Sequence, residues 1–378
     1  MDTNGLNNGG MDPMAGEAPI PEQAVTREET DKKCPNCGGI MQFAPAEGML
    51  YCPYCEHKEE IKVNDQKFVA EELDFYAAEE EASCDWGVAT KSVICKSCGA
   101  ETIYDVNDMS SECPYCGSNQ VMEDPNSKKI MAPGGVVPFK LDAAEASKRF
   151  KDWIGRKFFC PKLAKESAKP DAFTGIYIPY WTFDSQTESD FHGEYGTEHR
   201  YRDSKGNTHT KINWHPTSGH HSRFIDDMLV CASSKQSGPI ITGLEPYDTK
   251  LTVEYKPEYM AGFKAERYTI KMKDAWETGK QKIDALLKGE IKEKIRARYH
   301  TSHARVNRLI TSHNNITYKY LLLPVWISAF KYQDKIYQFM VNGQTGKVNG
   351  KTPISWIKVG LVALGIIAVV ILIYMYYL

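Results

Sequence analysis

Hydrophobic residues are spaced in several different ways along this chain, and each spacing predicts a different element. Residues 359–378 are twenty positions without a charge, and an apolar helix of this length is ~30 Å long, enough to cross the hydrocarbon core of a membrane. Between 274 and 299, apolar residues recur every three or four positions, which is typical of a helix with one face in a core. That stripe consists of Trp276, Ile283, Leu287, Ile291 and Ile295.

Aromatic and basic residues flank the apolar C-terminal segment as they flank membrane spans. Trp356 precedes it and a tyrosine cluster lies near its end. Because lysines gather on the cytoplasmic side of a span, they place the bulk of the chain in the cytoplasm. We therefore expect 353–378 to be a single-pass anchor in the cell membrane; a buried core helix is the alternative. The tyrosines are Tyr374, Tyr376 and Tyr377, and the lysines are Lys347, Lys351 and Lys358.

Residues 125–352 combine β-rich and helical patterns. A second helix is predicted over 141–156, with Ala144, Ala146, Phe150 and Trp153 facing a core. β-Branched and aromatic runs broken by Gly, Asn and Asp predict strands. A region of this length can bury a substantial core, so we expect one α+β domain of antiparallel strands and helices. The predicted strands cover Val136–Val137, 175–183, 228–233, 251–255, 318–332 and 335–341, closed by a hairpin turn at Asn342-Gly343.

A faint repeat suggests that this domain has two related halves. IPYWTF at 178–183 and LPVWISAF at 323–330 each place Pro, Trp and Phe in an apolar run. The repeat fits either a paired aromatic ligand surface or aromatic core packing, and burial of large aromatic side chains favours the core.

The first 124 residues are polar and rich in cysteine. We expect a disordered arm over 1–30, small cysteine-rich units over 31–62 and 93–124, and an acidic linker over 63–92 containing a helix at 66–82. Each cysteine-rich unit holds two CxxC pairs separated by fourteen residues. The pairs are Cys34/Cys37 with Cys52/Cys55, and Cys95/Cys98 with Cys113/Cys116.

Four cysteines at this spacing predict a zinc ribbon. A tetrahedral Zn²⁺ needs four thiolates at ~2.3 Å, and each CxxC turn supplies two of them. Gly38, Gly99 and Gly117 directly follow ligand cysteines, where glycine lets the backbone turn and direct N–H groups at sulfur. We expect two structural zinc ions. A redox CxxC motif lies between a strand and a helix, whereas each second CxxC pair here closes a unit that another CxxC pair begins. Disulfide bonds also fit poorly, because no secretory signal precedes the cysteines.

Charge divides the chain in two. Residues 1–124 contain 8 Lys and Arg against 25 Asp and Glu, a net charge of −17, whereas the remainder has 38 against 24, a net charge of +14. Because nucleic-acid affinity comes mainly from Lys and Arg, the acidic ribbon region argues against nucleic-acid binding and favours protein partners. The basic remainder suits the anionic surface of a membrane.

Six histidines between 192 and 221 offer a second metal or acid–base centre. They could act with Asp190, Glu194 or Asp203, although no pair has a diagnostic metal-binding spacing. More often such residues lie on solvated hairpins. The histidines are His192, His199, His209, His215, His220 and His221.

Common catalytic signatures are missing from the sequence, including GxSxG, HExxH and GxGxxG. TGKVNGKT at 345–352 lacks the first glycine of a phosphate-binding loop and is followed by Pro353. We therefore expect no enzymatic, helicase or nucleotide-binding activity and no catalytic residue.

Several segments carry a resemblance to a known family: both cysteine units, the PYW and LPVW segments, YMAGFKAERY at 259–268, VNGQTGKVNG at 341–350 and the terminal span. With these segments the chain resembles the TFIIB-type zinc-ribbon membrane proteins of Gram-positive bacteria. Members often carry names borrowed from the primosomal replication-restart helicase. The resemblance implies an envelope-associated complex with flotillin-like (SPFH) or phage-shock proteins.

Taken together, these patterns predict a membrane-tethered, non-enzymatic adaptor or scaffold that recruits protein partners through zinc ribbons at the cytoplasmic face of the membrane. Two alternatives remain open at this point. One is a nucleic-acid-associated regulator that uses the ribbons, and the other is a metalloenzyme that uses the histidine-rich hairpins.

Overall fold

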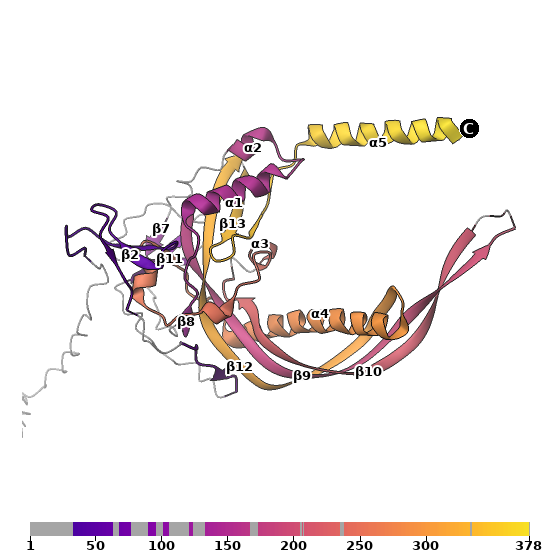
Figure 1. Cartoon of the computed structure of the whole chain (residues 1–378), viewed down its shortest axis with the longest axis horizontal. Coiled ribbons are helices and arrows are strands. Elements are labelled where there is room, and N and C mark those ends of the chain that lie inside the picture. Colours follow the sequence, from indigo (N-terminus) through magenta and orange to yellow (C-terminus); the bar gives the residue numbers. More distant parts are fainter. Residues whose placement is uncertain are drawn as a thin grey trace, which may run out of the picture.

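A computed structural model describes most of the chain, which forms an arch of long strands (Figure 1). The described residues are 33–62, 68–76, 90–95, 101–105, 121–123, 133–166, 173–204, 206, 208–234, 238–332 and 335–377.

Three long antiparallel strands build the arch. They are β9 (Thr174–Arg202), β10 (Thr208–Cys231) and β12 (His303–Tyr332). β9 lies between the other two, pairing with β12 from Gly196↔His303 to Thr174↔Ile327. The side of β9 that faces away from β12 pairs with β10 as far as Tyr180↔Cys231. From Tyr180 to Gly196, β9 has a paired strand on both sides, so it is the central strand of the arch.

Both outer strands bulge at the same level of the arch. The register of β10 shifts between Ile225 and Met228, and that of β12 shifts between Asn314 and Thr317. Asp227 and Asn315, with φ of 48° and 49°, carry the left-handed backbone within these shifts. A bulge bends a strand and increases its twist, so the bulges divide the arch into a proximal part and a distal arm, which we define as residues 186–225 and 286–314.

The proximal part is a mixed sheet with both faces covered. The order is β14-β13-β12-β9-β11-β6-β5-β7, with β4 and β8 joined to β12. Every residue of β9 from Gly175 to Ser185 is buried. The additional strands are β4 (Leu73–Asp74), β5 (Thr90–Cys95), β6 (Glu101–Asp105), β7 (Val121–Glu123), β8 (Gly135–Val136), β11 (Lys264–Ala265), β13 (Lys335–Asn342) and β14 (Val348–Gly350).

Aromatic side chains from the repeated segments form the proximal core. Trp181 is 2% exposed and Trp326 is 7% exposed, which confirms the core-packing interpretation of the repeat. Each indole also fixes a loop to the sheet, because Trp181 donates a hydrogen bond to Ile270 O and Trp326 donates one to Leu141 O, both at 2.9 Å. Buried indole N–H groups need such acceptors.

Two long helices pack on the same face of the sheet, within one buried cluster. In α1 (Ala143–Gly155), Phe150 stacks on Phe339 of the sheet. α4 (Met272–Tyr299) lies along the inner, concave face of the arch (Figure 1), and its predicted stripe from Trp276 to Ile295 is buried throughout. The short helices are α2 (Lys162–Glu166), α3 (Pro239–Thr242), η2 (Thr249–Leu251) and η3 (Pro257–Met260).

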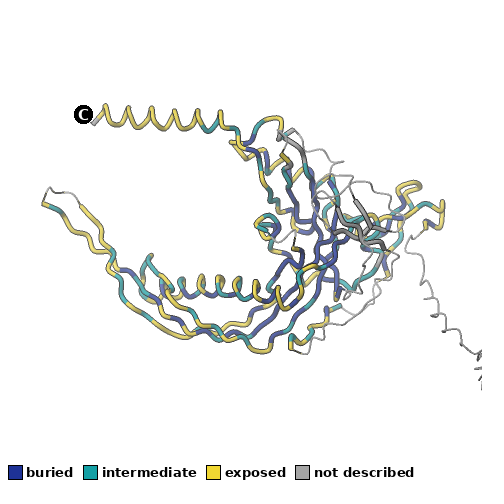
Figure 2. The backbone as a smooth tube through the Cα atoms, turned by 180° about the vertical axis from the view of Figure 1, so that it is seen from behind, coloured by how far each residue is buried: buried dark blue, intermediate teal, exposed yellow. Residues whose placement is uncertain are grey.

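The apolar C-terminal segment forms α5 (Trp356–Tyr377), which extends away from the body with its side chains exposed (Figure 2). Its apolar stretch has a mean hydropathy of 2.7, and none of it is buried. It is the one helix in the described part of the chain that is long and apolar enough to cross a membrane. Its start is held by hydrogen bonds from Ser355 N to Phe159 O and from Lys358 Nζ to Phe158 O and Cys160 O.

Several sequence predictions need correction. Ala144 is exposed on α1. The predicted strand at 251–255 supplies only an isolated bridge, Val253↔Val136, because a 3-10 turn precedes it. In the acidic linker, described residues 68–76 contain strand β4 instead of helix, since β4 adds to the edge of β12. The sequence also gave no signal that residues 303–317 extend β12.

Candidate metal centre

The first cysteine unit folds as two similar turns joined by a small sheet. The sheet contains β1 (Gln42–Ala44), β2 (Met49–Tyr51) and β3 (Lys58–Glu59) in antiparallel order. In the first turn, Gly38 N donates to Cys34 O at 2.8 Å, and in the second, Glu56 N donates to Cys52 O at 2.9 Å. Gly38 and Glu56, at equivalent positions, have φ of 73° and 60°. A residue with left-handed backbone conformation therefore closes both turns, glycine in the first and glutamate in the second.

The two turns bring four sulfur atoms together. The Sγ atoms of Cys34, Cys37, Cys52 and Cys55 all lie within 4.8 Å of one another. The Cys34–Cys55 and Cys37–Cys52 Sγ separations are both 3.4 Å. Four thiolates at ~2.3 Å from a tetrahedral Zn²⁺ lie about 3.8 Å apart. The cluster therefore fits a four-coordinate metal ion, with Cys34 and Cys52 buried and the other two cysteines exposed.

Backbone amides act on the ligand sulfurs. Burial raises the pKa of the Cys52 thiol, but hydrogen bonds from the amides of Tyr54 and Cys55 and from neighbouring thiols outweigh it and lower the pKa to about 7. A sulfur that accepts N–H groups holds a negative charge more readily, which is the state that binds metal. These donors are not among the glycines that follow ligand cysteines; at Cys37 the sulfur accepts a hydrogen bond from the amide of Gly39, next to Gly38.

The first cysteine unit is packed against the body. Phe43 of β1 is 3% exposed, its amide donates to Ala261 O at 3.0 Å, and its ring meets Tyr259 edge-on with centroids 5.4 Å apart. Because an extra buried aromatic side chain stabilises such a contact by several kcal/mol, the metal-site turns are held in a defined position relative to the sheet.

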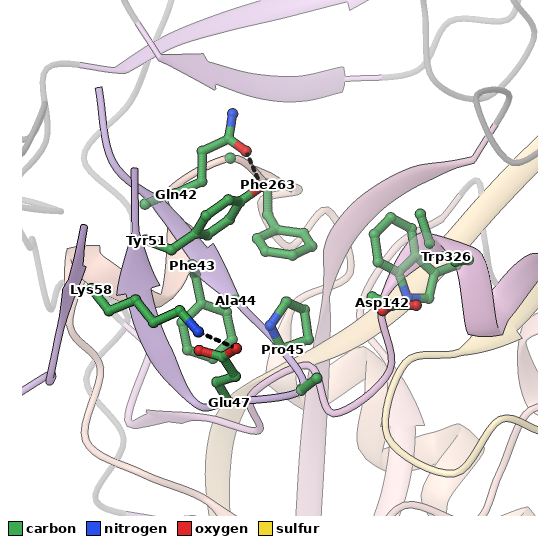
Figure 3. Close-up of a pocket in the computed structure, with 15 residues that line it drawn as sticks. Gln42, Phe43, Ala44, Pro45, Glu47, Tyr51, Lys58, Asp142, Phe263 and Trp326 are labelled. Carbon is green, nitrogen blue, oxygen red and sulfur yellow. Dashed lines mark hydrogen bonds and ion pairs between the residues drawn. The ribbon is translucent and has the colours of Figure 1, made fainter. Parts of the chain in front are cut away.

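A groove lies between this unit and the body (Figure 3). It encloses about 540 Å³ and has aromatic walls formed by Phe43, Phe263 and Trp326. An ion pair between Lys58 Nζ and Glu47 Oε1, at 2.6 Å, lies on the side of the cysteine unit. A volume of this size accommodates a peptide side chain or a small molecule.

The second predicted ribbon falls largely outside the described residues. Cys98, Cys113 and Cys116 are not among them, and of Cys95 only the backbone in β5 is described. Strands β5, β6 and β7 continue the main sheet through the pairing of Ala265 in β11 with Ile103. The predicted second zinc site therefore stays a prediction.

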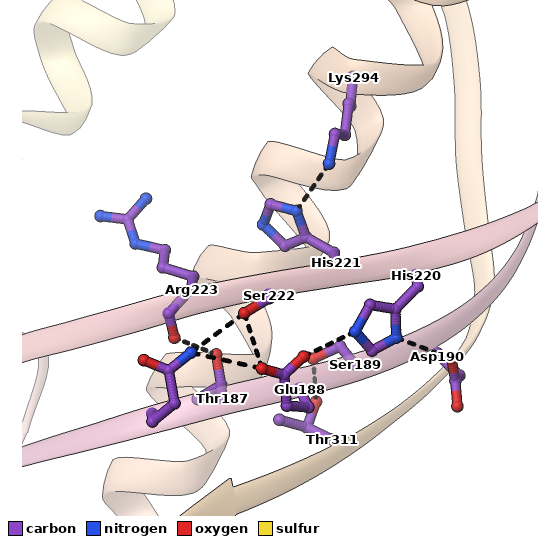
Figure 4. Close-up of polar contacts among 11 residues, drawn as sticks. Thr187, Glu188, Ser189, Asp190, His220, His221, Ser222, Arg223, Lys294 and Thr311 are labelled. Atoms are coloured by element: carbon purple, nitrogen blue, oxygen red, sulfur yellow. Dashed lines mark hydrogen bonds and ion pairs between the residues drawn. The ribbon is translucent and has the colours of Figure 1, made fainter.

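The histidine-rich segment forms cross-strand pairs instead of a ligand cluster (Figure 4). His220 Nε2 lies 2.6 Å from Glu188 Oε2, and its Nδ1 lies 3.0 Å from Asp190 Oδ1. The adjacent His221 turns to α4, with Nε2 3.1 Å from Glu290 Oε2. Neighbouring residues of a strand face opposite sides of a sheet, so the two imidazoles cannot share a ligand.

The other predicted partners are also dispersed. His209 Nε2 pairs with Asp203 at 2.9 Å, whereas Glu194 is taken by Arg305 at 2.5 Å and is not paired with histidine. His215 Nε2 lies 3.0 Å from the Thr197 hydroxyl oxygen. Within the described residues, the cysteine cluster is the one group of three or more potential ligand side chains close enough for a metal.

Sequence reasoning missed a partly buried ionic cluster at the bulges. Lys319 Nζ lies 2.7 Å from Asp227 Oδ1, 3.4 Å from Glu72 Oε1 and 3.8 Å from Asp184 Oδ2. Burial raises the pKa of Asp184 to about 7, despite a hydrogen bond from the Asp227 amide and the charge of Lys319. The only sequence signal is the charge of Asp184 and Lys319 within apolar runs. The cluster ties the acidic linker to the bend of the arch.

Comparison with proteins of known sequence identifies one informative similarity. YdjG of Bacillus subtilis (strain 168), described as an uncharacterized protein, is 30% identical over 334 residues, which are 86% of this chain and 91% of YdjG. No family model matches the chain. No solved structure matches it either.

Proposed function

The chain belongs to the family of Bacillus subtilis YdjG, and from this premise we propose that it is a membrane-tethered, non-enzymatic adaptor that presents zinc ribbons to protein partners. The observation that carries the proposal is that a potential metal site and a potential membrane anchor belong to the same arch and lie apart from each other. The four-cysteine cluster and the exposed apolar helix α5 lie at opposite sides of the body (Figure 1).

Zinc is the ion that the ligand set favours. Four cysteine thiolates in a tetrahedral arrangement are typical of structural Zn²⁺, and a closed shell leaves no position for substrate or water. In this proposal Cys34, Cys37, Cys52 and Cys55 hold one zinc ion. Cys95, Cys98, Cys113 and Cys116 hold a second.

The anchor supplies the location. From Val359 onward, α5 carries no charged side chain, and a helix that is apolar all round requires either lipid or a partner on every side. With α5 in the cell membrane and lysines at its start, the body lies in the cytoplasm. Reduced thiols in that compartment remain available for zinc.

The partner is a protein in this account, and the groove beside β1 is its contact site. Aromatic walls with one ion pair at the side are typical of a surface that takes an apolar side chain from a partner. The resemblance to TFIIB-type zinc-ribbon membrane proteins points to flotillin-like or phage-shock proteins as partners.

The test is capture of crosslinked partners from intact membranes with the tagged full chain. Cys52→Ser should remove partners that depend on the first ribbon while the chain stays in the membrane pellet after alkaline carbonate. Cys231→Ser, a buried cysteine away from the cluster, is the matched control and should capture the same partners as the wild type.

Two outcomes count against the proposal. If Cys52→Ser captures every wild-type partner, the first ribbon does not recruit them. If carbonate releases the wild-type chain from the membrane, α5 is not an anchor.

A further inference from the structure

The far end of the arch and the C-terminal helix project to the same side of the molecule. In Figures 1 and 2, the tip of the β9–β10 hairpin, whose described residues are 197–204, 206 and 208–211, and the C-terminal end of α5 both point away from the cysteine unit. Of the parts outside α5, this tip reaches farthest in the direction in which α5 leaves the body. A surface that holds α5 therefore faces the hairpin tip.

The distal arm is basic where it approaches its tip. Residues 197–211 contain 4 Lys and Arg against 2 Asp and Glu, and residues 294–308 contain 5 against none. The two segments meet at the base of the tip, where His303 pairs with Gly196 in the sheet and its Nε2 lies 3.0 Å from Glu198 Oε1. The result is a concentration of positive charge at one end of the arch, in a chain whose total net charge is −3.

The carboxylates of this region already have partners within the arm. Glu194 accepts hydrogen bonds from Arg305 at 2.5 Å and Asn307 at 2.8 Å. Glu198 contacts His303 at 3.0 Å and Asp203 contacts His209 at 2.9 Å. The acidic groups therefore do not compete for the remaining basic side chains.

Three basic side chains at the tip remain open to an external anion. Arg200, Arg202 and Lys211 are exposed, and none of them forms an ion pair with another described residue. Tyr201, between the two arginines, is 47% exposed. An exposed tyrosine flanked by arginines is the combination found where proteins meet lipid headgroups.

We propose that the hairpin tip binds the anionic headgroups of the membrane that holds α5. This inference rests on the proposed membrane anchor and adds a second contact, made by Arg200 and Arg202 on one face of the hairpin and by Tyr201 and Lys211 on the other. Guanidinium and ammonium groups would donate hydrogen bonds to lipid phosphates, and the chain would meet the membrane at both ends of the arch.

The geometry sets a condition on this contact. The hairpin reaches farther in this direction than the end of α5 does (Figures 1 and 2), so a span placed along the present axis of α5 would carry charged tip residues into hydrocarbon, which is unfavourable. Residues 351–355, between the sheet and α5, form neither helix nor strand. They are where α5 would tilt until the tip lies at headgroup level, and this tilt would exchange the hydrogen bonds of Ser355 and Lys358 with residues 158–160 for contacts with water and headgroups.

The experiment uses the full chain in vesicles with a photocrosslinking phenylalanine analogue in place of Tyr201. In vesicles of phosphatidylcholine and phosphatidylglycerol, the tip should crosslink to lipid. In vesicles of phosphatidylcholine alone, crosslinking should fall severalfold, because the zwitterionic surface lacks the attracting charge. The same analogue at Tyr374, within α5, reports insertion of the anchor.

Charge variants sharpen the result. Each basic residue near an anionic surface is worth a factor of about five in binding, so Arg200→Gln with Arg202→Gln should weaken the tip–lipid equilibrium roughly 30-fold. Lys250→Gln with Lys273→Gln, two exposed lysines near the proximal end, remove the same charge and should leave tip crosslinking unchanged.

Each failure is distinguishable. Lipid crosslinking at Tyr374 without crosslinking at Tyr201 overturns the tip contact and leaves the anchor intact, whereas loss at both positions overturns the anchor itself. Equal tip crosslinking in both kinds of vesicle, or in the arginine variant, also overturns the inference. So does salt-sensitive capture of DNA or RNA by the tip in preference to anionic vesicles.

Discussion

The first cysteine unit and the histidine-rich distal arm are both dense in metal-ligating side chains, yet only the first gathers them. Four cysteine Sγ atoms lie within 4.8 Å of one another. In the arm, His220 pairs with two carboxylates on one face and His221 turns to α4 on the other. The difference teaches that backbone geometry, more than the number of ligands, determines whether a metal site forms.

The two backbones explain this difference. A CxxC turn reverses the chain within four residues, so both sulfurs point at one centre. A strand alternates its side chains between two faces, and the carboxylates on β9 capture the imidazoles that face them. The arm therefore uses its histidines in ion pairs and hydrogen bonds that join strands.

Loss of a cysteine ligand is the strongest way to test this contrast. Cys52→Ser should lower the zinc content by one ion per chain and expose the first cysteine unit to limited proteolysis, because structural zinc contributes about 10–16 kcal/mol to such folds. Zinc content is measured by elemental analysis of the purified full chain.

The matched variant in the arm is His220→Gln with His221→Gln, which should retain the full zinc content. Equal loss of zinc from the cysteine and histidine variants would show that the arm also holds metal, and the contrast between the two regions would be wrong.

A core truncation in the arm should have the next largest effect. Ile295 is 2% exposed and packs with Phe191 and Ile291 between α4 and the strands. Ile295→Ala should destabilise the arm by about 2–5 kcal/mol. Hydrogen exchange should become faster over 186–202 and stay unchanged in the cysteine unit. Leu286→Ala, at a 36% exposed position of the same helix, should have a smaller effect, and a uniform increase across the chain would contradict a locally supported arm.

The predictable parts of this molecule are those specified by nearby residues. The ligand turns follow from CxxC spacing, α4 from its apolar stripe, and α5 from its uninterrupted hydrophobicity. The burial of Trp181 and Trp326 also follows, because large aromatic residues in apolar runs rarely lie at the surface.

The remainder depends on pairs that are far apart in the sequence. Residues 303–317 are a strand because they pair with β9 more than a hundred positions earlier, and their polar composition gives little sign of it. Phe43 meets Tyr259 and Lys319 meets Asp184 through the same long-range arrangement. No local pattern encodes which distant residue a side chain will contact.

Backbone strain in the second ligand turn gives a smaller effect. Glu56 has the left-handed conformation that Gly38 has in the first turn. Glu56→Gly should relieve about 0.5–1 kcal/mol of strain. Since folding of such a unit is coupled to metal binding, zinc affinity should rise about 2–5-fold in competition with a chelator.

Two variants separate strain from charge. Glu56→Gln removes the charge and keeps the backbone conformation, so it should give little of the gain. Gly38→Ala introduces strain at the equivalent position and should weaken zinc binding. A gain in Glu56→Gln equal to that in Glu56→Gly would assign the effect to electrostatics.

The smallest predicted effect is a pair of opposite pKa shifts in adjacent histidines. Hydrogen bonds to Asp190 and Glu188 raise the pKa of His220, whereas burial, followed by the charges of Lys294 and Arg223, lowers the pKa of His221. Because the folded-state pKa of His220 lies above its unfolded value of about 6.5, its pairs stabilise the arm fully below that pH. The contribution is lost as pH rises through the folded pKa.

His221 behaves in the opposite sense, since its depressed pKa makes protonation costly in the folded arm and weakens the arm as pH falls through the unfolded value. NMR titration of labelled histidine rings, assigned with the single His→Gln variants, should place His220 above His221. Coincident titration of the two rings would mean that they share one environment. The alternation of side chains between the two faces of a strand would then not explain why the histidines of the arm lie apart while the cysteine sulfurs of the ligand turns lie together.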